Sequence, residues 1–240
     1  MVFTFPLMLF FFKKYLVWTD KPKLQLIRGL ILLTANISFF YSISVISLPK
    51  ALTLAFVAPL VVTAFSPFFL GESVGYRRWA AVIIGFIGSL VVIRPGFLEI
   101  NLASLAALGT GIMYGFYLII TRKLSTSDNP LLTLLLTGVV GAIIATTFMP
   151  FVWVSPTFNQ WFIMAAIGLF ACIGHLFIIL SLKYADASKL APFSYFEIVT
   201  NIIIAYYFFG DFPDSWTFLG LFIIAVSYTH LTLPTTCTVY

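Results

Sequence analysis

The sequence contains few charged residues: Asp, Glu, Lys and Arg together make up 9% of its 240 residues, against about 25% in soluble globular domains. Hydrophobic residues make up 61%, and the mean hydropathy is +1.08. So few charges do not suffice for the surface of a water-soluble domain. The composition therefore excludes a soluble domain and predicts a protein that is embedded in the lipid bilayer.

Cysteine and histidine are also scarce, with two residues of each. Cys172 lies in an apolar stretch and Cys237 near the end of the chain, and neither has a partner at metal-ligand spacing. The basic residues are dispersed at segment ends rather than gathered on one face, which argues against nucleic-acid binding. We expect no disulfide, no metal, no cofactor and no nucleic-acid partner.

Apolar runs divide the chain into segments long enough to cross a membrane, since about 20 apolar residues span the hydrocarbon core. Nine segments result: 2–17, 25–47, 49–70, 78–94, 102–121, 131–150, 160–182, 188–209 and 215–227. The connections between them are too short to hold a soluble domain. The fold class predicted is an all-α polytopic membrane protein.

The basic residues alternate between the connections. Eleven of the thirteen Lys and Arg residues fall in every second connection, and only Lys50 and Arg94 fall in the others. Short loops rich in Lys and Arg stay on the cytoplasmic side, so each segment is expected to cross the bilayer once. The cytoplasmic stretches are then 13–28, 71–78, 122–130 and 183–188, and the outer ones are 48–50, 95–101, 151–159 and 210–214.

Both ends of the chain look incomplete. The first segment begins at Met1 without the charged lead-in of a signal peptide and reads as the later part of a membrane helix. At the other end, residues 227–240 turn abruptly polar and rich in threonine, and we interpret them as a non-native tail. The last helix is therefore expected to end early, at about residue 228.

A faint internal repeat appears when the chain is displaced by 139 residues. The displacement aligns Lys189 with Lys50, Phe208 with Phe69, Gly210 with Gly71 and Asp211 with Glu72. Five segments separate the two copies, an odd number, so the two glycine-acid turns are expected on opposite sides of the membrane. This is an inverted repeat, an arrangement common in secondary transporters.

The motifs of both copies resemble those of EamA-type transporters of the drug/metabolite transporter superfamily. The first copy carries Leu48-Pro49-Lys50 through Ala58-Pro59-Leu60, Phe69-Leu70-Gly71-Glu72, Arg77-Arg78-Trp79, Gly85-Phe86-Ile87-Gly88 and Ile93-Arg94-Pro95-Gly96. The second carries Tyr184-Ala185, Ala191-Pro192-Phe193-Ser194-Tyr195, Gly210-Asp211-Phe212-Pro213-Asp214 and Trp216 to Gly220. The resemblance covers residues 24–226.

This resemblance implies ten helices in two inverted five-helix halves, of which the chain holds helices two to ten. The first repeat would occupy residues 1–101, lacking helix one and the start of helix two, and the second residues 102–226. The resemblance also implies a multi-pass protein of the bacterial inner (plasma) membrane, and we expect a monomer or weak dimer.

Glu197 is the strongest candidate for a functional residue. It lies nine residues into the segment that starts at Ser188, about 13 Å deep, and no other acidic residue is so placed. A carboxylate at that depth costs about 3 kcal/mol, so such groups usually face a cavity and carry function. A structural hydrogen bond by a protonated Glu197 is the alternative.

Other candidates share the segment of Glu197. Asn201 lies four residues later on the same helical face, Tyr195 adds a polar group, and Pro192 leaves a carbonyl without its usual donor. A broken hydrogen-bond ladder beside polar groups is one way in which transporters expose backbone to a solute. Pro59 is expected to act likewise in the matching segment, although proline can also serve merely as a kink.

Three further segments carry polar groups at helical spacing. The candidates are Asn36, Tyr41 and Ser44, then Tyr114, Tyr117 and Thr121, and His175 alone. Pore lining is one interpretation, while interhelical hydrogen bonding is the other, and a lone buried histidine is more often structural. The glycine pairs Gly111 with Gly115 and Gly85 with Gly88 are expected to permit close helix packing.

These residues favour a secondary transporter (permease) of small organic metabolites that works by alternating access, with possible proton coupling through Glu197. A channel or a structural membrane component is the alternative. An intramembrane enzyme is disfavoured because the sequence contains no His-Glu-x-x-His, no Gly-x-Ser-x-Gly and no mid-membrane pair of aspartates. The abundant aromatic residues suit amino acids, nucleosides or S-adenosylmethionine as solute, and they suit lipid contact equally.

Overall fold

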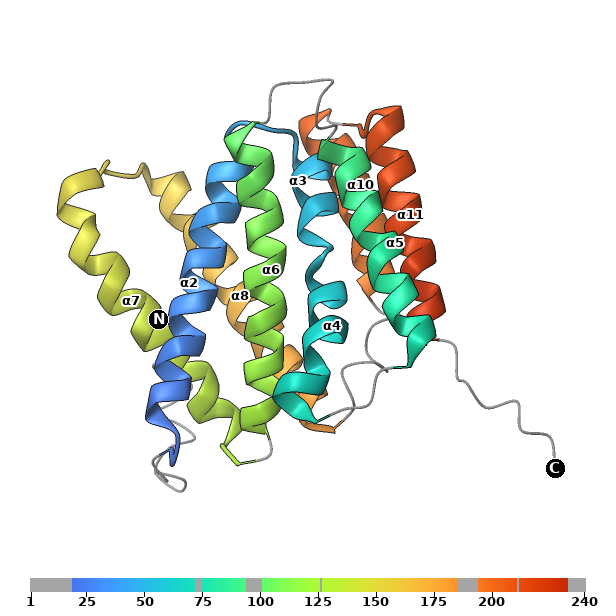
Figure 1. Ribbon diagram of the computed structural model, residues 1–240. Helices are drawn as coiled ribbons and strands as arrows, with labels where there is room; N and C mark the ends of the chain where they lie inside the picture. Colours follow the sequence, from blue (N-terminus) through green and yellow to red (C-terminus); the bar gives the residue numbers. More distant parts are fainter. Residues whose placement is uncertain are drawn as a thin grey trace. The chain divides into compact units, whose positions relative to one another are not determined.

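The computed structural model describes residues 19–71, 75–93, 101–125, 127–184, 194–210 and 212–232. These residues form nine helices and no strand (Figure 1). The helices are α2 (Pro22–Ile43), α3 (Leu48–Ala55), α4 (Ala58–Leu70), α5 (Tyr76–Ile93), α6 (Leu102–Ser125), α7 (Pro130–Val152), α8 (Phe158–Tyr184), α10 (Ser194–Phe209) and α11 (Ser215–Thr232).

The predicted apolar segments are confirmed as helices wherever the structure describes them, and the segment 2–17 lies outside the described residues. Among the described residues, five stretches are long and apolar enough to cross a membrane: α2, α3 with α4, α6, α7 and α8. The ends differ by a few residues from the expected ones. For example, α6 continues to Ser125 through Arg122 and Lys123, because Arg122 hydrogen-bonds to the Leu182 carbonyl oxygen and Lys123 is exposed.

The chain forms two compact units. Unit 1 comprises residues 1–33 and 120–185, and unit 2 comprises residues 34–119 and 186–240. Helices α2 and α6 contribute to both units, one end to each. These units differ from the two repeats that the sequence predicts, residues 1–101 and 102–226. The division into repeats stays a prediction.

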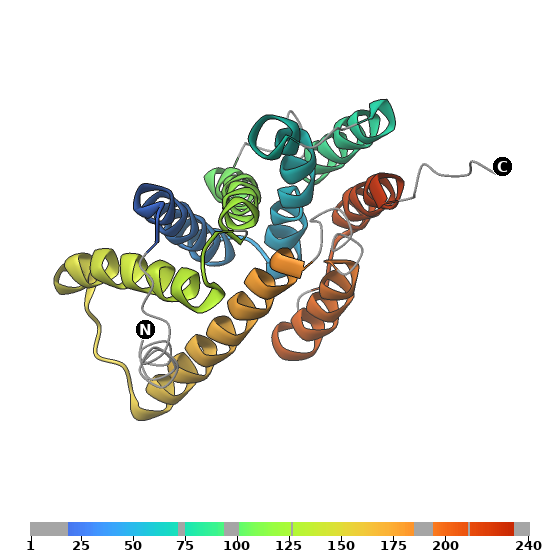
Figure 2. The same cartoon turned by 90° about the horizontal axis from the view of Figure 1, so that it is seen from below.

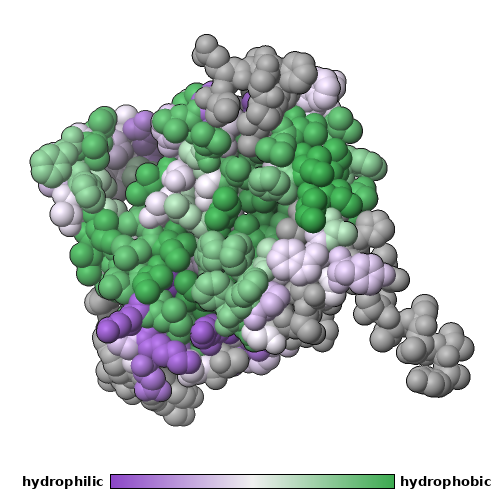
Figure 3. Space-filling view, in the orientation of Figure 1, coloured by the Kyte–Doolittle hydropathy of each residue, from purple (hydrophilic) through white to green (hydrophobic). Residues whose placement is uncertain are grey.

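Four helix ends meet at one end of unit 1, which we call the basic end. They are the start of α2, the end of α6, the start of α7 and the end of α8. Lys21 Nζ donates to Ser127 Oγ at 3.4 Å, and Arg122 Nη1 donates to the Leu182 carbonyl oxygen at 2.6 Å. Figure 3 shows hydrophilic side chains gathered where α2 begins. The alternation of basic residues predicts that these four helix ends share one side of the membrane.

In unit 2, α5 and α11 lie side by side in both views (Figures 1 and 2). Their backbones approach closely at Gly88 and Gly220. A Cβ atom on Gly220 would lie 2.7 Å from the Gly88 carbonyl oxygen and 2.3 Å from Val92 Cγ2, which no real Cβ atom tolerates. Gly88 is therefore a packing site, as expected, and its partner is Gly220.

The turns after α4 and α10 are both made by glycine. Gly71 and Gly210 have φ values of 72° and 68°, the left-handed conformation that ends a helix at low cost only with glycine. The expectation that these glycines end their helices is confirmed, while Glu72 and Asp211 lie outside the described residues. At the start of α11, Asp214 Oδ1 accepts a hydrogen bond from the Thr217 amide at 2.7 Å and caps the helix.

The last helix ends later than the sequence predicts. We expected an end at about residue 228, but α11 continues to Thr232. Threonine and histidine lower helix propensity only slightly, so Thr229, His230 and Thr232 do not interrupt the helix.

Candidate functional site

A break interrupts the apolar stretch of residues 48–70 in unit 2. Helix α3 ends at Ala55 and α4 begins at Ala58, roughly 12 Å along the stretch. Pro59 has no amide hydrogen, so the Ala55 carbonyl lacks the donor that an unbroken helix would supply. The interruption that Pro59 predicts is confirmed.

Helix α6 packs tightly against this break. A Cβ atom on Gly111 would lie 2.5 Å from the Ala55 carbonyl oxygen, and one on Gly115 would lie 2.8 Å from the Ala58 carbonyl oxygen. Both positions thus require glycine because backbone, which cannot rotate away, occupies the space. Gly111 and Gly115 are packing sites, as expected, and they hold α6 against the broken helix.

The second half of α2 packs on α6 through one face. Thr110 Oγ1 donates to the Ala35 carbonyl oxygen at 3.2 Å, and Ser42 Oγ donates to the Ala103 carbonyl oxygen at 2.5 Å. Asn36 follows Ala35 and is exposed, about two-thirds of the way along α2. An exposed amide at that depth in a membrane helix requires water or a polar partner.

The other candidate on α2, Tyr41, is 44% exposed. Its carbonyl oxygen accepts a hydrogen bond from Ser44 Oγ at 2.7 Å, so Ser44 satisfies backbone at the end of the helix. The structure thus places Asn36 and Tyr41 off the α6-packing face.

Two tyrosines stack along α6. The rings of Tyr114 and Tyr117 are 5.5 Å apart between centroids and inclined by 19°, and Tyr117 is fully buried. Stacking fixes both rings, so their hydroxyl groups have defined positions. This pair gives unit 2 a rigid aromatic element on α6, the helix that packs against the break.

The candidates near the start of α10 are described only in part. Asn201 is half-buried on α10. Pro192 lies outside the described residues, and so do the side chains of Tyr195 and Glu197, although the helix includes their backbone. The role predicted for Glu197 stays a prediction.

His175 lies on α8 in unit 1 and is half-buried. The other described candidates lie in unit 2, so His175 belongs to a different part of the chain from Asn36, Tyr41, Tyr114, Tyr117 and Asn201.

Arg28, which we counted among the basic residues of the first connection, lies within a helix instead. Arg28 is the seventh residue of α2 and is fully buried. Its Nε donates to Thr121 Oγ1 at 2.7 Å, and its Nη1 donates to the Thr133 carbonyl oxygen at 3.1 Å and to Thr137 Oγ1. These oxygens solvate the charge and make burial of the guanidinium tolerable.

A second buried group continues this network toward the basic end. Asp128, 8% exposed, accepts hydrogen bonds at its Oδ2 from Thr19 Oγ1 at 2.6 Å and Gln25 Nε2 at 2.7 Å. Gln25 Nε2 also donates to Thr133 Oγ1 at 3.1 Å. Because a carboxylate only accepts, the Gln25 nitrogen must point toward Asp128, and this leaves the buried Gln25 Oε1 without a hydrogen-bond partner.

A weak sequence signal for this network exists. Gln25 and Arg28 are three residues apart on one helical face, and Thr133 and Thr137 are four apart on another. Each pair marks a polar stripe near the end of a membrane helix. A single sequence does not show that the two stripes contact each other, because more than 100 residues separate the partners.

Chemically, unit 2 offers an interrupted backbone hydrogen-bond ladder and the exposed amide of Asn36, and unit 1 offers the buried guanidinium of Arg28 and the buried carboxyl group of Asp128, both held by neutral groups. Among the described residues, no three His, Cys, Asp or Glu side chains lie close enough together to hold a metal ion. The arrangement suits binding and movement of a solute through helices.

Comparison with known proteins agrees with this reading. The chain is 28% identical over 217 residues to an S-adenosylmethionine uptake transporter of Rickettsia bellii, covering 89% of this chain and 74% of the relative. It is 29% identical over 189 residues to a riboflavin transporter of Vibrio cholerae, with coverage of 76% and 62%. A pseudopaline exporter of Pseudomonas aeruginosa is 25% identical over 207 residues, with coverage of 84% and 72%.

The fold also occurs in a solved structure. A protein crystal structure aligns with a TM-score of 0.67 at 19% identity and covers 91% of this chain and 79% of the other. Residues 1–94 and 101–233 match the EamA-like transporter family. Since these matches span most of the chain, it is a multi-pass inner-membrane protein that belongs to the EamA-like transporter family of the drug/metabolite transporter superfamily.

Proposed function

We propose that the chain is a secondary transporter that moves a small organic metabolite across the inner membrane by alternating access. The similarity to relatives named as uptake transporters and exporters carries this proposal. These relatives are transporters rather than enzymes, and accordingly we propose no catalytic site.

Features of unit 2 support a solute path. The break between α3 and α4 frees the Ala55 carbonyl at membrane depth, and Asn36 exposes an amide there. Non-helical backbone within a membrane is tolerated where it is buried in protein or lines a water-filled cavity. Tyr114, Tyr117 and Asn201 complete the proposed path in this unit, with Glu197 as the group that exchanges a proton or a cationic solute.

The architecture proposed is two inverted five-helix halves, residues 1–101 and 102–226, with nine of ten helices present and 227–240 as a non-native tail. The matching left-handed caps at Gly71 and Gly210, 139 residues apart, support this arrangement. Each cap follows a helix that contains or lies beside a candidate proline. Such pairs of interrupted segments in the two halves are typical of transporter binding sites.

For the solute we propose S-adenosylmethionine as the first candidate and riboflavin as the second. Both compounds carry a fused heteroaromatic ring, which stacks on tyrosine side chains such as those of α6. We propose a monomer or weak dimer as the transporting form.

Uptake by reconstituted vesicles tests the proposal. Proteoliposomes containing the chain should take up labelled S-adenosylmethionine or riboflavin at a rate that saturates with concentration and falls with excess unlabelled solute. The Rickettsia bellii transporter serves as the positive control, and protein-free vesicles as the negative control. A flux that rises linearly and resists competition would instead indicate a channel, and no flux of either solute would indicate a structural component.

A further inference from the structure

The buried polar network of unit 1 joins segments that are distant in the chain. Its hydrogen bonds connect Thr19, Gln25, Arg28, Thr121, Asp128, Thr133 and Thr137. These residues come from the segment before α2, from α2, from the end of α6, from the α6–α7 connection and from α7. All of them lie at or next to the basic end.

Thr133 links the two halves of the network. Its hydroxyl accepts from Gln25, which also donates to Asp128, while its carbonyl oxygen accepts from Arg28 at 3.1 Å and from Thr137 Oγ1 at 2.8 Å. A change at any one of these residues therefore alters the partners of the others. Hydrogen bonds coupled in this way within a low-dielectric interior reinforce one another.

Among the described residues, the buried side chains of α7 and its hydrogen bonds to other segments lie in its first three turns. Within the described residues, its hydrogen bonds to other segments all end on Thr133 or Thr137. Its buried side chains are residues 132–135, and Val140 lies close to α2, where a Cβ added to Gly29 would be 2.8 Å from Val140 Cβ.

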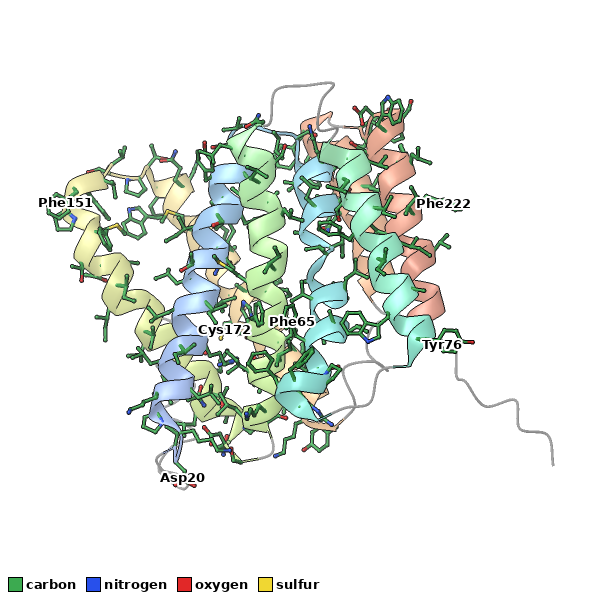
Figure 4. The ribbon with its side chains drawn as sticks, in the orientation of Figure 1. Asp20, Phe65, Tyr76, Phe151, Cys172 and Phe222 are labelled. Atoms are coloured by element: carbon green, nitrogen blue, oxygen red, sulfur yellow. The ribbon has the colours of Figure 1, made fainter. Side chains whose placement is uncertain are left out.

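From residue 145 to its end at Val152, every residue of α7 is exposed. No heavy atom lies within 4 Å of a Cβ placed on Gly141, and Phe151, whose ring points away from the helix in Figure 4, is 84% exposed. Thr147 donates to the Ile143 carbonyl oxygen of its own helix and to no other described segment. The outer half of α7 therefore adds little to its attachment.

We propose that the network around Arg28 is a clamp that holds the basic end of unit 1 closed, and that α7 is the element it releases when that end opens. The place of this opening in a transport cycle rests on the proposed function. The clamp itself is a property of unit 1 and can be measured without any solute.

Cys172 provides a native reporter for the opening. It lies on α8, is 8% exposed and packs in a cluster with Leu134 of α7 and Ile179 (Figure 4). Release of α7 would remove Leu134 from the thiol and admit a reagent. In a Cys237→Ser background Cys172 is the only cysteine, so its alkylation by N-ethylmaleimide reports this position alone.

Two threonines of α7 provide a matched pair of variants. Thr137 and Thr147 each donate to the carbonyl oxygen four residues earlier, at 2.8 and 2.9 Å, but only Thr137 accepts from Arg28. Thr137→Val should speed alkylation of Cys172 at least about threefold, and Arg28→Gln about tenfold or more, because bonds to a charged group are lost. Thr147→Val should stay within about twofold of the unaltered chain.

Equal rates for Thr137→Val and Thr147→Val would overturn the clamp. If Arg28→Gln does not fold, Thr137→Val alone tests the clamp, because valine has nearly the same size as threonine and should not disturb the packing. A Thr137→Val variant with an altered KM for S-adenosylmethionine but an unchanged alkylation rate would also overturn it, because Arg28 would then act on the solute. Absence of transport with faster alkylation would leave the clamp standing and count against the proposed function alone.

Discussion

The α-carbon of Gly111 on α6 faces the carbonyl oxygen of Ala55 so closely that a Cβ atom at residue 111 would lie 2.5 Å from that oxygen. The contact joins an unbroken membrane helix to the end of a broken one. The Ala55 carbonyl oxygen receives no hydrogen bond from residue 59, because proline has no amide hydrogen. This oxygen lies against position 111 of α6, where glycine has no side chain. One prediction about unit 2 depends on this packing.

Gly111→Ala should lower the stability of the protein by about 1–3 kcal/mol, because the added methyl group overlaps backbone that cannot rotate away. Thermal unfolding in detergent, followed by circular dichroism or by loss of the monodisperse peak, measures the effect. Gly109→Ala is the matched control. It lies on the same helix with no atom within 4 Å of an added Cβ, and alanine there should leave the midpoint unchanged or raise it slightly. Equal midpoints for the two variants would show that α6 does not pack on the break.

Asn36 should face water rather than lipid. In an otherwise cysteine-free chain, Asn36→Cys should react with a charged, water-soluble methanethiosulfonate, whereas Ile37→Cys should not. Ile37 is 61% exposed and one residue away, so exposure alone does not distinguish the two positions. Reaction at both positions, or at neither, would remove Asn36 from the proposed solute path.

The topology predicts that the basic end of unit 1 faces the cytoplasm. On intact cells, an impermeant thiol reagent should label a cysteine at Asn159 and leave one at Lys123 unlabelled until the membrane is opened. Lys123 is exposed, whereas its neighbour Arg122 donates to Leu182 and should not be replaced. The reverse labelling pattern would mean that the orientation is inverted.

Glu197→Gln keeps the shape of the side chain and removes its charge. If Glu197 exchanges a proton or a cationic solute, this variant should insert and fold normally but lose transport or the dependence of transport on pH. Flux measured between pH 5.5 and 8 tests the expectation. Near-normal flux with an unchanged pH profile would show that Glu197 is a structural hydrogen-bonding residue.

Much of the helical architecture could be predicted from the sequence because membrane helices are bounded by apolar length and by basic residues. The break before Pro59 and the tight packing at Gly111 and Gly115 could be predicted because each depends on the residue itself. Proline has no amide hydrogen to donate, and glycine has no side chain to keep a neighbouring helix away. Arg28 was misplaced for the opposite reason. Its burial depends on Thr121, Thr133 and Thr137, and the sequence alone does not bring these residues to it.

Counterflow tests the central claim, alternating access by a carrier, most directly. Proteoliposomes are loaded with a high concentration of unlabelled S-adenosylmethionine, diluted into a trace of labelled S-adenosylmethionine, and the internal label is followed over time; the same protocol is run with riboflavin. A carrier must return after each release, so the label should accumulate transiently above its external concentration and then decline. Label that only equilibrates with the medium, at a rate independent of the internal load for both solutes, would contradict the account and indicate a channel or leak.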